Sequence, residues 1–94
     1  MIDTFSAELF TPHIDKAVSL PDGRELTLKA VDQRGSQATG GMRAFALLLR
    51  GPPDGIVPEG LHRLTFDGGE SFELYLIPIR TTARDRQDYQ IIFN

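Results

Sequence analysis

The stretch Phe45-Ala46-Leu47-Leu48-Leu49-Arg50 forms most of a run from Met42 to Arg50 that is apolar on both faces of an extended chain. Side chains alternate along a strand, so Phe45, Leu47 and Leu49 share one face, and Ala44, Ala46 and Leu48 share the other. Strands that are apolar on both faces are typical of the interior of a sheet. We therefore predict that residues 42–50 form the central strand of the fold.

The segment before this strand has the pattern of a β-hairpin. Residues 24–31 alternate apolar and polar side chains, which predicts a strand with one buried and one solvated face. The sequence Pro21-Asp22-Gly23 before it is typical of a turn. We expect residues 13–20 to form the partner strand of this hairpin.

The segment after the central strand predicts three more strands. Residues 61–66 and 72–79 flank the turn sequence Asp67-Gly68-Gly69-Glu70, a strong hairpin signal. Pro78 cannot donate a hydrogen bond to a neighbouring strand, so it should lie at a strand end, an edge or a bulge. Residues 89–93 alternate again and should form a last strand that is tied into the sheet.

Two segments do not fit the strand pattern. Phe5 and Leu9 lie four residues apart behind Thr4 or Asp3 as N-cap, which predicts a short helix up to Pro12. Residues 33–41 are rich in Gly and polar side chains and should form a flexible loop. Six short strands with turns between them indicate an all-β, mainly antiparallel fold. We expect a small barrel or sandwich, and a single compact domain over residues 1–94.

Composition restricts the classes of function. The 94 residues carry a formal net charge of −3, which disfavours nucleic acid as a partner. The chain has no cysteine, which fits a reducing compartment, and we expect a cytoplasmic protein. No apolar stretch approaches the roughly 20 residues that cross a bilayer, so no membrane association is expected. The sequence does not predict an oligomeric state.

No catalytic, metal-binding or cofactor-binding pattern is recognisable. The two histidines, His13 and His62, have no second ligand at a known spacing, and no serine lies in a Gly-x-Ser-x-Gly motif. We therefore predict no enzyme activity and no cofactor. The alternative is a small ligand-binding barrel or hydrolase that uses His62, Glu59 and Tyr75 near one rim.

The segment that follows the central strand is the best candidate for binding or for a structural turn, through Arg50, Gly51, Pro52, Pro53, Ile56 and Val57. The Arg50 guanidinium should be partly buried against a carboxylate or backbone carbonyls. Ile56 and Val57 could anchor a partner from a stiff loop, or the loop could fold back and cap a barrel. The sequence leaves both arrangements open.

Three more arginines, Arg80, Arg84 and Arg86, lie beside Asp85 and Asp88. The favoured interpretation is an exposed loop of mixed charge, and the alternative is contact with an anion or a nucleic acid.

The chain resembles a family of short bacterial domains of unknown function that are often encoded beside phage-type tail-collar (microcystin-dependent-type) proteins. The resemblance rests on four stretches, which are Phe45 to Pro52, similar to an F-x-L-L-F-R-G-P signature, Pro58 to Leu64, Leu74 to Ile79, and the closing Tyr89 to Asn94. The family usually has Gln at the position of Glu59 and Tyr at that of His62. The resemblance implies an accessory of a phage-tail-like or tail-collar protein. Our hypothesis is a non-enzymatic binding or assembly module that acts through sheet edges or the Pro-rich loop.

Overall fold

A computed structural model of the chain describes residues 6–33, 45–81 and 83–93. A short helix, α1 (Ala7–Phe10), runs into a 3₁₀ turn, η1 (Thr11–His13). Six strands follow: β1 (Ala17–Ser19), β2 (Glu25–Gln33), β3 (Phe45–Gly51), β4 (Gly60–Thr65), β5 (Ser71–Ile79) and β6 (Gln87–Phe93). The predicted all-β fold with a short N-terminal helix is confirmed.

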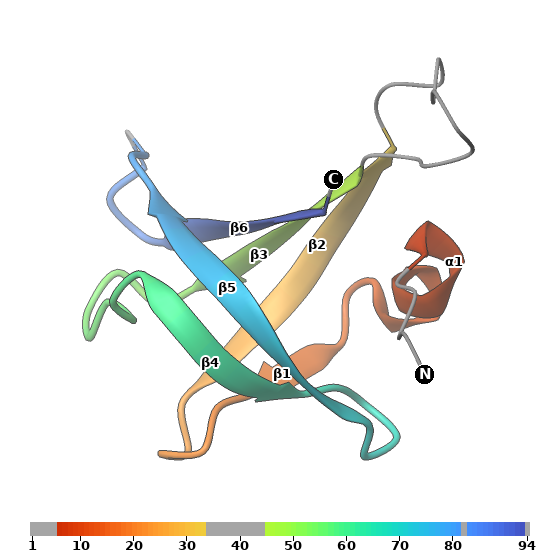
Figure 1. Ribbon diagram of the computed structural model, residues 1–94. Coiled ribbons are helices and arrows are strands. Elements are labelled where there is room, and N and C mark those ends of the chain that lie inside the picture. Colours follow the sequence, from red (N-terminus) through yellow and green to blue (C-terminus); the bar gives the residue numbers. More distant parts are fainter. Residues whose placement is uncertain (1–5, 34–44, 82, 94) are drawn as a thin grey trace.

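The strands form a closed antiparallel barrel in the order β1-β2-β3-β6-β5-β4 (Figure 1). The sequence left open whether the strands form a barrel or a sandwich, and the structure shows a barrel. The seam between β1 and β4 is short, with Ser19 opposite Thr65 as its Cα partner. The hairpins β1–β2 and β4–β5 are formed as predicted, and the turn between β4 and β5 places Gly68 and Gly69 at positive φ.

Strand β3 has the interior position that its two apolar faces predict. It pairs with β2 on one side and with β6 on the other, over nearly its whole length. Phe45, Leu47 and Leu49 point into the barrel and are buried, whereas Ala46 and Leu48 face outward and are partly exposed. The outer face of β3 is therefore apolar without being covered by another element among the described residues.

An aromatic cluster closes one end of the barrel. Phe10, from α1, is completely buried, and its ring centroid lies 5.3–6.1 Å from those of four other phenylalanines. These are Phe45, Phe66, Phe72 and Phe93, which belong to the strands or directly follow one. Rings at such distances pack favourably. Helix α1 therefore acts as a plug, and Figure 1 shows it beside the end of the barrel.

The structure corrects the prediction for residues 13–20. Only Ala17–Ser19 are a strand, because Pro12 favours the helical turn η1 and Asp15 then adopts a positive φ of 71°. The helix is also shorter than expected, and residues 1–5 lie outside the described part, as does most of the predicted loop at 33–41.

Pro78 lies opposite Tyr89, one residue before β5 ends, as predicted. None of the described helices has the length and hydropathy that a membrane span requires.

Candidate functional site

The loop between β3 and β4, residues 52–59, seals the end of the barrel opposite α1. Val57 turns inward and is only 1% exposed, within the same core as the strand residues. Its backbone N–H donates a hydrogen bond of 2.9 Å to the hydroxyl oxygen of Tyr89, which is itself buried. Of the two arrangements that the sequence left open, the structure shows the loop folded back as a cap. Val57 belongs to this cap and is not an exposed anchor.

Arg24 holds the same loop from outside the barrel. Its Nη1 donates to the carbonyl oxygen of Gly55 at 2.9 Å, and its Nε donates to Asp22 Oδ2 at 2.7 Å. The hydrogen bonds that Arg24 donates to Asp22 lower the pKa of the Asp22 carboxyl below its ordinary value. The loop is thus fixed on both sides, by Tyr89 inside and by Arg24 outside. Neither of these two residues was among the sequence-derived candidates.

Gly51 ends β3 where the chain passes closest to the core. A Cβ atom at this position would lie 2.6 Å from Cδ2 of Leu26 and 3.5 Å from Cε1 of Tyr89. Strand β3 extends through Gly51, whereas the predicted strand ended at Arg50. Pro52 and Pro53 lie outside the strand and are exposed. In this Arg-Gly-Pro-Pro segment, Gly51 therefore has a packing role.

An exposed apolar surface lies next to this fixed loop. Leu61 on β4 is 66% exposed, and its Cα partner on β5, Tyr75, is 49% exposed. Ile56, on the loop, is 50% exposed. Two short contacts join the loop to these strands: Tyr75 Oη donates to Glu59 Oε2 at 2.8 Å, and His62 Nε2 lies 2.7 Å from the carbonyl oxygen of Pro58. We call Ile56, Glu59, Leu61, His62 and Tyr75 the loop–β4–β5 surface.

The three residues of the alternative hydrolase hypothesis, His62, Glu59 and Tyr75, all lie on this surface. The bond to Glu59 raises the pKa of the Tyr75 hydroxyl above its ordinary value, so this hydroxyl is kept protonated and acts as a donor. The contact with Pro58 engages Nε2 of His62 as a donor to a carbonyl oxygen. The barrel interior contains a core of buried apolar side chains. The Tyr75 hydroxyl and His62 Nε2 are therefore both engaged in contacts with the β3–β4 loop.

The two histidines lie apart. The ring of His13 packs 5.5 Å from that of Phe66, near the aromatic plug. His62 precedes Phe66 by four residues, which is about 13 Å along an extended strand. Within residues 6–33, 45–81 and 83–93, no three His, Cys, Asp or Glu side chains are grouped so that they could hold a metal ion.

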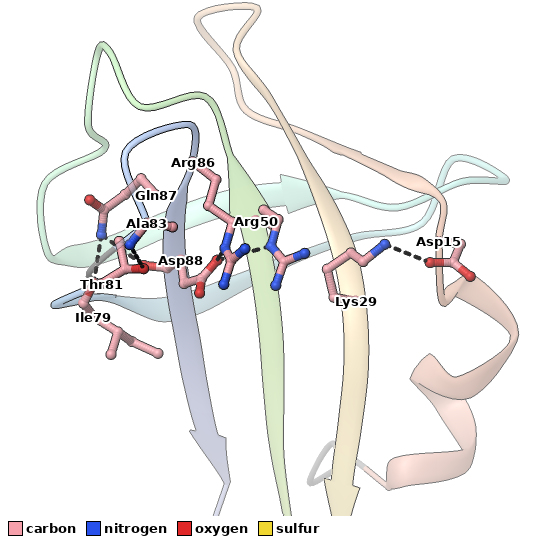
Figure 2. A network of polar contacts seen from close by, with 9 residues as sticks. All are labelled: Asp15, Lys29, Arg50, Ile79, Thr81, Ala83, Arg86, Gln87 and Asp88. Atoms are coloured by element: carbon pink, nitrogen blue, oxygen red, sulfur yellow. Dashed lines mark hydrogen bonds and ion pairs between the residues drawn. The ribbon is translucent and has the colours of Figure 1, made fainter.

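Arg50 pairs with a carboxylate, as its position at the end of β3 predicts. Its Nε lies 3.1 Å from Oδ1 of Asp88, the Cα partner of Arg50 on β6. Nε of Arg86 lies 3.4 Å from the same oxygen, without the geometry of a hydrogen bond. The Asp88 side chain is only 14% exposed and stands between the two guanidinium groups (Figure 2). Arg50 therefore links two strands, β3 and β6, and does not fasten the turn that follows it.

Comparison with known proteins gives one result. The model of a family described as a domain of unknown function, DUF6916, matches residues 5–93, and the chain belongs to this family. No curated protein and no solved structure matches the chain.

Proposed function

We propose that this domain is a non-enzymatic binding or assembly module that recognises a partner protein through the loop–β4–β5 surface. The observation that carries the proposal is the pair Leu61 and Tyr75, two large side chains that are 66% and 49% exposed and lie directly opposite each other on the outside of the barrel. Apolar and aromatic side chains that stay exposed side by side are typical of binding surfaces.

The fixed loop supports this proposal. Ile56 is exposed on a segment whose carbonyl groups are bound by Arg24 and whose next residue, Val57, is anchored in the core. A side chain that is held in place before binding loses little conformational entropy when a partner covers it. Tyr75 is suited to the same role, because its hydroxyl is already oriented by Glu59 while its ring remains exposed.

The resemblance in the sequence supplies the class of partner. Domains with the Phe45 to Pro52 signature are often encoded beside phage-type tail-collar proteins, so we propose that the domain is an accessory of a phage-tail-like or tail-collar protein. The closed barrel supports a role as a compact assembly unit, because its strands enclose a core of packed apolar side chains.

Co-expression with a neighbouring tail-collar-type protein tests the proposal, with size-exclusion chromatography as the readout. We expect the two proteins to elute together and Leu61→Asp to abolish the complex, since a charge would be desolvated at the centre of the contact. Ala17→Asp is the matched control, because Ala17 is exposed on β1, away from this surface, and its substitution should leave the complex intact. Separate elution at several salt concentrations would contradict the proposal, as would equal effects of the two substitutions.

A further inference from the structure

A second surface feature lies on the outer face of β2, β3 and β6. A hollow of about 420 Å³ is lined by Ala30, Val31, Asp32, Ala46, Leu47, Leu48 and Gln90. Ala46 and Leu48 are the outward residues of β3, and Leu48 lies between Ala30 on β2 and Gln90 on β6. Small side chains at Ala30 and Ala46 produce the depression, and Leu48 makes its floor apolar. It has the size and character to receive apolar side chains.

A pair of arginines lies at one end of this hollow. Arg50 follows Leu48 by two residues on the same face of β3, which is about 7 Å along the strand. Asp88 precedes Gln90 by two residues on the same face of β6 and pairs with Arg50. Figure 2 shows the side chains of Arg50, Asp88 and Arg86 next to one another across these two strands.

The charges at this end are not balanced. Two guanidinium groups share the single carboxylate of Asp88, and the terminal Nη groups of Arg50 and Arg86 make no hydrogen bond to another described residue. The β5–β6 loop adds Arg80, Arg84 and Asp85, all exposed. These four arginines and two aspartates carry +2, so the chain's net charge of −3 consists of +2 here and −5 elsewhere. The end of the hollow is therefore a local cationic site on an acidic protein.

We infer that this face is a second binding site, whose ligand is a polypeptide segment with apolar side chains in the hollow and a carboxylate on Arg50 and Arg86. The planar guanidinium fork binds carboxylates with two parallel hydrogen bonds, and Asp88 holds both arginines in position. The hollow selects an aliphatic or aromatic side chain through Ala46 and Leu48. This site is separate from the loop–β4–β5 surface and does not depend on it.

The chemistry of the hollow distinguishes this ligand from other anionic partners. A single-stranded nucleic acid needs aromatic side chains on which its bases stack, and the residues that line the hollow include none. An acidic, amphipathic segment satisfies both the apolar and the cationic part of the site.

The register of β3 sets the spacing within that segment. The guanidinium of Arg50 stands about 7 Å from the level of Leu48 and about 13 Å from that of Ala46. In a helical ligand these distances correspond to an acidic residue about five to nine positions from the apolar one. In an extended ligand they correspond to about two to four positions.

Selection from a displayed library of random 16-residue peptides tests the inference on the full chain. Peptides are selected on the wild-type protein and then depleted on Ala46→Glu, which places a charge in the hollow. We expect the survivors to combine Leu, Ile or Phe with Asp or Glu at the spacing above. In a binding titration with the best peptide, Arg86→Gln should weaken the affinity about five- to ten-fold, the value of one hydrogen bond at a partly exposed site. Arg63→Gln, the loss of an exposed arginine on β4, should leave it unchanged.

Three results would overturn the inference. The selection could give no enrichment over the Ala46→Glu protein, or it could enrich basic or purely apolar peptides. The Arg86 and Arg63 substitutions could also have equal effects on the affinity. Binding of oligo(dT) that Arg86→Gln abolishes and Ala46→Glu does not would assign the arginines to nucleic acid instead. Self-association that Ala46→Glu abolishes would make this face a contact between two copies. Thermal melts of all variants establish that the substituted proteins are folded.

Discussion

Replacement of Tyr89 by Phe removes one oxygen atom from the barrel and tests how the β3–β4 loop is held. The Tyr89 hydroxyl accepts a hydrogen bond of 2.9 Å from the backbone N–H of Val57, and both residues are at most 1% exposed. Phe keeps the ring and therefore the packing of the core. What is lost is the acceptor for an N–H group that water cannot reach.

The cost can be worked out for each of two responses. If the loop stays in place, a buried N–H remains unpaired, which costs about 1–3 kcal/mol. If the loop lifts to hydrate this N–H, Val57 leaves the core, which costs about 1.5–3 kcal/mol of apolar burial. Both responses lead to about 2 kcal/mol. For a domain of this size we expect the melting temperature to fall by roughly 8–16 °C.

Tyr75→Phe is the matched control for Tyr89→Phe, because the same atom is removed from an exposed tyrosine whose partner, Glu59, can bind water instead. We expect Tyr75→Phe to change stability by less than about 0.5 kcal/mol. Thermal denaturation followed by circular dichroism measures both variants, and hydrogen exchange at the Val57 amide shows whether the loop has lifted. Equal melting temperatures for the two variants would refute the role assigned to Tyr89.

Three further predictions concern packing, charge and chain length. Gly51→Ala should lower stability by about 1–3 kcal/mol in urea denaturation, because its Cβ would stand 2.6 Å from buried Leu26; an unchanged midpoint would show that Leu26 adapts without cost. Glu59→Gln should bring the raised pKa of Tyr75 back toward 10.0 in an NMR titration of the ring. A raised pKa means that this contact stabilises the fold fully below the ordinary pKa and is lost as the pH rises through the raised one, so an unaltered titration would rule out Glu59 as the cause. Deletion of residues 91–94 should leave little soluble folded protein, because β6 supplies interior side chains between β3 and β5; a truncated chain that melts cooperatively near the parent temperature would contradict this.

The strands could be predicted because the alternation of apolar and polar side chains that specifies a strand lies within the strand's own sequence. Alternation of apolar side chains placed β2, β5 and β6 within about two residues of their observed bounds, and the two apolar faces of β3 gave its interior position. The same rule failed at β1. The fixed φ of Pro12 continues the helical segment into η1, and Asp15 adopts a left-handed conformation. Both features prevent residues 13–16 from joining the strand that the alternation predicts.

The contacts that build the candidate sites could not be predicted, because they join residues far apart in the sequence. The Tyr89 hydroxyl meets the Val57 amide 32 positions away, and Arg50 meets Asp88 at a separation of 38. Alternation shows that Tyr89 points inward, but only strand order and register determine what its hydroxyl reaches. The same limit explains why the sequence left open whether residues 52–59 cap the barrel or present an anchor. The structure assigns Val57 to the cap and leaves Ile56 exposed.

The central claim is that a sealed barrel binds its partner through the loop–β4–β5 surface. Because the chain contains no cysteine, Leu61→Cys and Glu25→Cys each introduce a single reporter thiol, the first on the proposed surface and the second on an exposed position of β2. The rate of thiol labelling is measured with and without the tail-collar-type protein. We predict that the partner slows labelling at position 61 at least ten-fold and leaves position 25 unchanged. Equal rates at position 61 in the presence and absence of the partner would contradict the claim.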